Sequence, residues 1–472
     1  MGAPVPPAPR VALFVAMALA TAALQAAALA TSRAWPAHAA AHLALYAAAG
    51  APWLLAIAVA RALPRAAIVV AVALAVALRA GAVFVPPVHS DDHHRYAWDG
   101  EVQRHGFGPY AFPASDPALA GLRGPTFEQI NHRDLPTIYP PLAQLAFRAL
   151  AHPGPRPVPW RAAVVAGDLA TAALLGYGAG PAAALTWLLA PLVLFELDVD
   201  LHLDGLAIPL LCAALVALAR GRRGLGGAAL GLAIAVKPLP LFVVVALRDR
   251  RVRLAALLAI VASALPFCRD PIRLVAVGEF GRRWRANDGA FAPILAAARA
   301  TVDATTAPGA PLRLGPLAPL VSGRDRDVVY ADELAGAIAR LVALALFGLV
   351  VARAARTSAT SSPGAQALHV TEAGIGAFLV LTPVLHPWYA LWSLPAVALG
   401  ARRRAFAWLW LVAAAPLGHL ALLGSLAGRG AAVPLWARLV EHVPPLAICA
   451  WTLAPSALGF PRGPSSYKLR RP

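Results

Sequence analysis

Apolar runs of about 17–23 residues recur from one end of this 472-residue chain to the other, and they constrain its fold more than any other feature. Each run is long enough to cross a hydrocarbon layer ~30 Å thick as an α-helix. The composition agrees, because 59% of the residues are hydrophobic, only 14% are charged, and the mean hydropathy is +0.65. A soluble protein of this length needs a more charged surface. The sequence therefore predicts an all-α polytopic membrane protein.

The net charge of +18 would suggest nucleic-acid binding in a soluble protein, but the distribution of the charge points elsewhere. Basic clusters lie just beyond apolar runs, at residues 220–223, 248–253, 353–356, 402–404 and 468–471. Such clusters mark the cytoplasmic ends of membrane spans. A nucleic-acid groove would need interleaved aromatic residues on a soluble surface, and the sequence has neither. We therefore expect a protein of the cytoplasmic membrane that contacts membrane lipids and no nucleic acid.

Placing every basic cluster in the cytoplasm predicts a single integral membrane domain of roughly 12–14 transmembrane helices, with both termini in the cytoplasm. The "KPLP" stretch at 237–240 interrupts one apolar run, which predicts two short helices that meet at a break. The successive segments are three N-terminal spans within 1–85, an external loop at 86–160, spans at 161–268, a second external loop at 269–332, C-terminal spans at 333–460, and a cytoplasmic tail at 461–472.

The acidic residues played no part in building this topology, and most of them fall on its external side. They gather in 86–160, 196–204 and 269–333. Asp and Glu contribute little to the orientation of a membrane protein, so their clustering needs another cause. A working site on the outer face would supply one. Within the first loop, residues 137–152 are amphipathic and too short to span, which predicts a helix at the membrane interface.

The stretch "SDDHHRYAWDG" at residues 90–100 holds the strongest candidate site. A carboxylate can take a proton from an attacking hydroxyl, an Arg can neutralise a phosphate, and aromatic rings can stack on a sugar. The alternative is a solvated helix with internal ion pairs. The residues that share or adjoin one helical face are Asp91, Asp92, Arg95, Tyr96, Trp98 and Asp99.

A second group of polar residues, "FELDVDLHLDG" at 195–205, includes His202 and Asp204. Carboxylates and a His at such spacing suit Mg²⁺ or Mn²⁺, although a short polar turn needs the same residues, and we assign no metal ligand. Lys237 sits at the helix break, where it either anchors an anion or extends to the membrane surface.

Two further stretches of predicted outer-side sequence could contact a substrate. Residues 381–395 bring His386, Trp388 and Tyr389 to the membrane boundary, where aromatic rings also form ordinary interfacial belts. In the second external loop, Arg282, Arg283 and Arg285 could bind a phosphate or contact lipid headgroups.

The Asp-x-x-Arg-Tyr-x-Trp-Asp-Gly pattern of residues 92–100 resembles the first external loop of bacterial polyprenol-phosphate-mannose-dependent mannosyltransferases of the GT-C glycosyltransferase superfamily. Two positions depart from the family pattern, because Gly108 and His386 stand where an Asn is common. Three predicted spans precede the loop instead of one, as an N-terminal addition. The resemblance continues at Pro109-Tyr110, at Tyr139-Pro140-Pro141, at Lys237 and Pro240 of the Lys-x-x-Pro, and at "HPWYALWSLP".

The resemblance implies a GT-C-like bundle with juxtamembrane helices in the first external loop. It also implies a polyprenyl-phosphate sugar, with mannose as the sugar, as donor on the outer face. An acidic residue of the first loop would be the catalytic base. Asp91 or Asp92 would then deprotonate a glycan or lipid acceptor, and a single displacement would invert the anomeric carbon. Neighbouring carboxylates raise one another's pKa, so the sequence leaves the choice between them open.

A transporter or flippase of lipid-linked sugars is the alternative function, because transporters place binding sites at broken helices. The concentration of acidic and aromatic residues in an outer loop, rather than at mid-membrane, favours the glycosyltransferase. No two halves of the chain resemble each other either, as the repeats of many transporters do.

Overall fold

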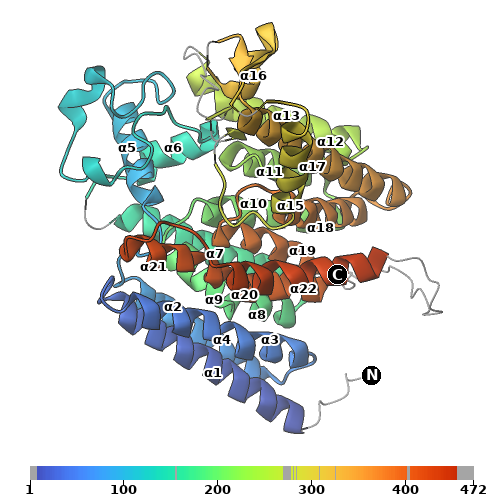
Figure 1. Cartoon of the computed structure of the whole chain (residues 1–472). Helices are drawn as coiled ribbons and strands as arrows, with labels where there is room; N and C mark the ends of the chain where they lie inside the picture. Colours follow the sequence, from blue (N-terminus) through green and yellow to red (C-terminus); the bar gives the residue numbers. More distant parts are fainter. Residues whose placement is uncertain are drawn as a thin grey trace.

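The computed structural model of the chain describes residues 8–154, 157–268, 278–279, 281–282, 284–307, 309–324, 326–400 and 404–453. Helices dominate these residues, and one short antiparallel pair joins β1 (Leu312–Arg313) to β2 (Val328–Val329). Figure 1 shows the helices packed as one bundle, with the first loop projecting from it at the upper left.

Seven helices of the described residues are long and apolar enough to cross a membrane, or eight if the bent pair Pro181–Leu188 and Pro191–Val199 forms one span. The prediction of an all-α polytopic membrane protein is therefore confirmed. The predicted 12–14 crossings also counted shorter apolar helices, such as Asp204–Ala219 and Arg223–Val236. At 1.5 Å per residue these helices are only about 24 and 21 Å long, which is less than a hydrocarbon layer of ~30 Å.

The N-terminal helices form a layer at one edge of the bundle, drawn in blue in Figure 1. Helix α1 packs against α3 and α4 along rows of buried Ala residues, such as Ala18 in α1 and Ala71 in α4. Small residues let helix backbones approach closely where lipid supplies no hydrophobic drive. The helices of this layer are α1 (Ala8–Ser32), α2 (Ala39–Ala48), α3 (Gly50–Val59) and α4 (Arg65–Ala82).

The first loop contains two helices that pack against each other, α5 (Asp92–Arg104) and α6 (Pro141–Leu150). A Cβ at Gly100 of α5 would lie 2.4 Å from the Phe147 carbonyl oxygen, so glycine is required for this close approach. Pro141 begins α6 at a position that needs no backbone N–H. The predicted amphipathic helix is therefore present over Pro141–Leu150. Two short 3₁₀ turns, η1 (Pro117–Leu122) and η2 (Phe127–Gln129), lie between these helices.

The middle of the chain contains the predicted helix break. Helix α11 ends at Val236, and Lys237 has extended backbone angles because a proline follows it. The elements of this part are α7 (Val158–Ala179), α8 (Pro181–Leu188), α9 (Pro191–Val193), the π-helical turn η3 (Leu194–Val199), α10 (Asp204–Ala219), α11 (Arg223–Val236), α12 (Leu241–Ala246), α13 (Arg250–Ala264) and η4 (Leu265–Phe267).

The C-terminal part contains both long helices and short turns. Helix α18 begins at Pro363, where the Ser362 side chain accepts a hydrogen bond from the Ala365 N–H. Beyond Leu381 the chain forms short turns instead of a long helix. The elements are α15 (Phe291–Asp303), η5 (Gly315–Leu317), α16 (Ala318–Ser322), α17 (Ala331–Thr357), α18 (Pro363–Leu381), η6 (Pro387–Ser393), α19 (Leu394–Leu399), α20 (Ala405–Ala414), η7 (Ala415–His419), α21 (Leu420–Leu426) and α22 (Leu435–Leu453).

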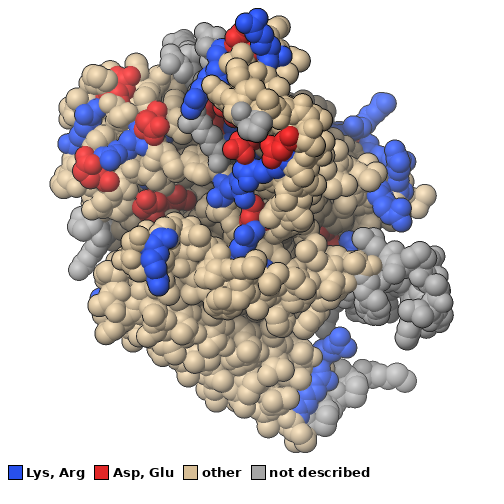
Figure 2. Space-filling view, viewed as in Figure 1, with Lys and Arg blue, Asp and Glu red and all other residues tan. Residues whose placement is uncertain are grey.

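The two sides of the bundle differ in charge. Helix α1 begins and α22 ends at the right of Figure 1, opposite α5 and α6. In Figure 2 basic side chains predominate at that right-hand edge, whereas acidic and basic side chains mix over the first loop. The predicted tail 461–472 lies outside the described residues.

Candidate active site

A cavity of about 880 Å³ lies between the first loop, the helix break after α11, and the segment that precedes η6. Its wall combines acidic, basic and aromatic side chains with apolar residues such as Leu239 and Phe378. The predicted site residues that line it are Asp91, Asp92, Arg95, Tyr96, Tyr139, Lys237, Arg285, His386, Trp388 and Tyr389.

The two neighbouring carboxylates share one hydrogen-bond donor. The side-chain amide of Asn131 donates to Oδ1 of Asp91 and to Oδ1 of Asp92, at 2.9 Å each. The hydroxyl of Tyr96 donates to Oδ2 of Asp92 at 3.3 Å. Asp91 is exposed, whereas Asp92 is half-buried. Burial raises the pKa of Asp92 above its ordinary value; His202 opposes this rise, and the charge of Asp91 adds to it.

Further along α5, the side chains attach the helix to the loop instead of facing the cavity. The Arg95 guanidinium, itself at the cavity edge, donates to Asp99 Oδ1 at 3.0 Å and to the His132 and Leu135 carbonyls at 3.2 and 3.1 Å. Trp98 packs edge-on against Phe127, with ring centroids 5.4 Å apart. Trp98 and Asp99 therefore lie outside the cavity lining, since each turn of α5 carries its side chains farther from it.

Tyr110 also lies outside the cavity lining. Its hydroxyl donates to the Tyr139 carbonyl oxygen at 3.0 Å, so it supports a residue that does line the cavity. The Tyr139 ring in turn meets the Tyr96 ring edge-on, with centroids 5.2 Å apart.

Lys237 has a carboxylate partner at the helix break. Its Nζ donates to both carboxylate oxygens of Asp204 at 2.8 Å and lies 4.8 Å from the centroid of the Tyr389 ring. Trp392 Nε1 also donates to Asp204, which is buried behind the cavity wall. Asp204 therefore offsets the cost of placing a cation in an apolar region.

Three stacked rings form one wall. The His386 and Trp388 rings lie 4.4 Å apart and nearly parallel, at 4°. The His202 ring also stacks on Trp388, with ring centroids 3.8 Å apart, and His202 is fully buried. His202 thus contacts the wall from behind instead of lining the cavity.

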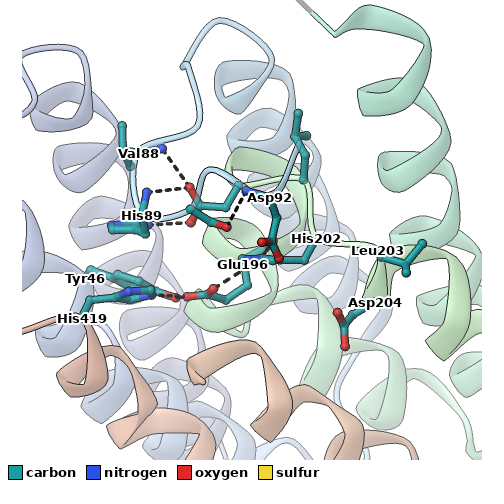
Figure 3. Close-up of polar contacts among 12 residues, drawn as sticks. Tyr46, Val88, His89, Asp92, Glu196, His202, Leu203, Asp204 and His419 are labelled. Atoms are coloured by element: carbon teal, nitrogen blue, oxygen red, sulfur yellow. Dashed lines mark hydrogen bonds and ion pairs between the residues drawn. The ribbon is translucent and has the colours of Figure 1, made fainter. Parts of the chain in front are cut away.

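Glu196 and Asp200 have separate partners, and Figure 3 shows Glu196 beside Tyr46 and His419. Glu196 accepts from the Tyr46 hydroxyl at 2.9 Å and lies 2.7 Å from His419 Nε2. Asp200 lies 2.6 Å from His89 Nδ1. In the part of the chain that the structure describes, no three His, Cys, Asp or Glu side chains come together as a metal site.

Of the three arginines predicted in the second external loop, only Arg285 is found among the residues that line the cavity. Arg282 donates to Glu279 at 2.6 Å and lies outside the lining, and Arg283 lies outside the described residues. Arg438, which was not predicted, also lines the cavity, and Arg285 and Arg438 both bind the carboxylate of Asp288, at 2.8 and 2.5 Å.

The sequence analysis also missed Asn131, His89 and His419. Asn131 follows no spacing rule that links it to α5, and His419 lies in a turn of an apolar segment. His89 directly precedes the "SDDHH" stretch, and its position beside these acids was the one available signal.

A family model described as "alpha-(1->6)-mannopyranosyltransferase, N-terminal domain" matches residues 10–249. The match covers half of the chain, including α5 and the helix break at Lys237. The chain belongs to this mannosyltransferase family. Neither a curated protein nor a solved structure matches it.

Membership assigns mannosyl transfer to the chain, with a sugar donor and an acceptor as substrates. It confirms the mannosyltransferase resemblance of the first loop. It also corrects the interpretation of the first three spans as an addition, because the match begins at residue 10 and includes all of α2, α3 and α4. These helices are part of the domain that defines the mannosyltransferase family.

Proposed function

We propose that this mannosyltransferase takes mannose from a polyprenyl-phosphate donor and transfers it to a glycan or lipid acceptor on the outer face of the cytoplasmic membrane. The observation that carries the proposal is the composition of the single cavity around Asp92. It combines three carboxylates and two kinds of cation with apolar residues from α11, α18 and α21. Such a wall suits a ligand with a sugar, a phosphate and a hydrocarbon chain.

Asp92 acts as the general base in this proposal. It removes the proton from the acceptor hydroxyl while that oxygen attacks the anomeric carbon, and the bond from this carbon to the phosphate oxygen breaks. The polyprenyl phosphate leaves with the bonding electrons, so the single displacement inverts the anomeric configuration. Burial raises the pKa of Asp92, which strengthens it as a base relative to an ordinary carboxylate. Asp91 is held beside it by the same Asn131 amide.

Lys237, Arg285 and Arg438 receive the phosphate charge. All three line the cavity and are paired with carboxylates: Lys237 with Asp204, which lies behind the cavity wall, and both arginines with Asp288, which also lines the cavity. The carboxylates orient the cations before the donor binds, and preoriented charge stabilises a leaving phosphate without reorganisation. Arg95 is less suited to this role because its guanidinium holds the 131–135 segment.

The orientation of the bundle is part of the proposal. The first loop lies outside, and α1 begins and α22 ends on the cytoplasmic side, where basic side chains predominate (Figures 1 and 2). A transporter of lipid-linked sugars would also use a helix break beside a cavity, but the family match favours transfer.

The donor is tested by supplying the purified protein with either polyprenyl-phosphate [³H]mannose or GDP-[³H]mannose. A mixture of lipid and oligosaccharide acceptors is present in both reactions. We expect label to reach an acceptor only from the lipid donor. Transfer from the nucleotide sugar alone would overturn the proposed donor and leave the family activity in place.

A further inference from the structure

Helix α2 places two polar side chains in the interior of the bundle. His42 and Tyr46 lie one turn apart on the same helical face, and both are fully buried. Buried polar groups in an apolar segment are costly unless they are hydrogen-bonded. Both side chains have polar partners near the first-loop acids, although α2 itself lies outside the cavity lining.

His42 contacts His89, in the segment that carries the proposed catalytic carboxylates. Its Nε2 lies 2.8 Å from Nε2 of His89, whose Nδ1 lies 2.6 Å from Oδ2 of Asp200. The backbone N–H groups of Val88 and His89 donate to the other oxygen of Asp200 at 2.9 and 3.0 Å. Asp200 and His42 therefore fix the chain at His89, two residues before Asp91.

The contact between the two Nε2 atoms needs one imidazole to donate and the other to accept. His42 Nδ1 lies 2.9 Å from the Ala28 carbonyl oxygen, which can only accept, and 3.0 Å from the Ser32 hydroxyl, which can also donate. Either tautomer of His42 therefore has a partner at Nδ1, and its Nε2 either accepts from His89 or donates to it. A replacement for His42 must offer a polar group that can do the same to preserve this contact.

Tyr46 contacts a residue behind the Trp388 wall of the cavity. Its hydroxyl donates to Oε1 of Glu196 at 2.9 Å, and the Glu196 carbonyl oxygen lies 2.8 Å from Nδ1 of His202. His202 stacks on Trp388, which lines the cavity. Tyr46 thus contacts the turn that ends at Asp200 directly, through Glu196, whereas His42 reaches Asp200 through His89.

We propose that His42 and Tyr46 are positioning residues for mannosyl transfer, which hold the Asp91–Asp92 segment and the Trp388 wall in a fixed arrangement around the cavity. This inference rests on the proposed function for its catalytic consequence. The contacts of His42 and Tyr46 lead to two different parts of the wall of one cavity. Other buried polar contacts of the α1–α4 layer, of Arg79 with Asp168 and of Gln25 with the Leu189 carbonyl oxygen, involve residues outside the cavity lining.

The first experiment measures position without any substrate. Hydrogen exchange is followed by mass spectrometry in peptides that span residues 86–95 of the full-length protein. The variants are His42→Phe, which keeps a ring without an acceptor, and His42→Gln, whose amide oxygen can accept from His89. The matched control is His38→Phe, because His38 begins the same helix but is exposed.

We expect the amides of residues 88 and 89 to exchange about tenfold faster in His42→Phe, because His89 loses the polar partner that holds it against Asp200. His42→Gln and His38→Phe should exchange at the wild-type rate. Unchanged exchange in His42→Phe, or equally fast exchange in His38→Phe, would overturn the positioning role. This result does not depend on the identity of the donor.

The second experiment measures turnover per bound donor in the same proteins and in Tyr46→Phe. We expect kcat to fall on the order of 10²-fold in His42→Phe, with donor binding within about twofold of wild type, because small displacements of reacting groups cost rate. His42→Gln should retain most of the wild-type kcat. A proportional loss of binding sites and activity would indicate a structural role only. Failure of wild type to use the lipid donor would overturn the proposed function, while the exchange result would still stand.

Discussion

The ammonium group of Lys237 lies 2.8 Å from both carboxylate oxygens of Asp204, at the point where the backbone of α11 breaks. The pair links the helix break to the start of α10. Asp204 is 1% exposed, whereas the Lys237 side chain is 21% exposed, so the pair presents its cation to the cavity. Lys237 can therefore stabilise the protein through Asp204 and also contact a substrate in the cavity, and the two roles can be tested separately.

Replacing Lys237 should lower the stability of the protein. Lys237→Met leaves Asp204 as an uncompensated buried charge, which costs about 3 kcal/mol. Adding Asp204→Asn removes that charge, so the double variant should regain most of the lost thermal stability in detergent. Mannosyl transfer should remain low in both variants, because neither supplies a cation to the phosphate. Recovery of transfer together with stability would show that Lys237 is only structural.

Removing the Asn131 amide should shift the pH dependence of transfer. The base must be ionised, so kcat/KM falls as the pH drops through the pKa of Asp92, which burial holds above its ordinary value. The Asn131 amide favours the charged carboxylate and lowers this pKa. In Asn131→Ala the acidic limb of the kcat/KM profile should therefore move to higher pH. An acidic limb that stays at the same pH, or moves to lower pH, would show that Asn131 does not lower the pKa of the base.

Arg285 and Arg282 provide a matched comparison within one segment. Arg285 lines the cavity, whereas Arg282 is paired with Glu279 outside it. Arg285→Ala should raise the KM for the lipid donor by about tenfold, because a charged hydrogen bond contributes roughly 1.5 kcal/mol or more. Arg282→Ala should leave KM near the wild-type value. If the phosphate bound at the outer surface of the loop, Arg282→Ala would raise the KM more than Arg285→Ala.

The sequence predicts the helices and the break well because both depend on local patterns. Apolar length decides where a chain can cross a membrane, and Pro238 forces Lys237 out of the helix wherever the segment packs. The face of α5 was predicted less well. Asp92 and Asp99 share that face, but they are about 10 Å apart along the axis, and the cavity reaches only the first turn.

The missed residues depend on contacts between distant segments. Arg438 reaches Asp288 from a helix near the other end of the chain, and Tyr46 reaches Glu196 across 150 positions. No local spacing relates such partners. The acids of 196–204 look like metal ligands in the sequence because their spacing is short, yet Glu196, Asp200 and Asp204 each pair with a residue from a different part of the chain.

The central claim is that Asp92 is the base of a mannosyl transfer from a lipid phosphate. Its most direct test compares transfer by wild type, Asp92→Asn and Asp303→Asn, at equal folded amounts and with donor binding measured separately. Asp303 is an exposed carboxylate at the end of α15 and serves as the matched control. We predict that Asp92→Asn binds the donor but transfers mannose about 10²- to 10⁴-fold more slowly, while Asp303→Asn is unaffected. Wild-type turnover in Asp92→Asn would contradict the account.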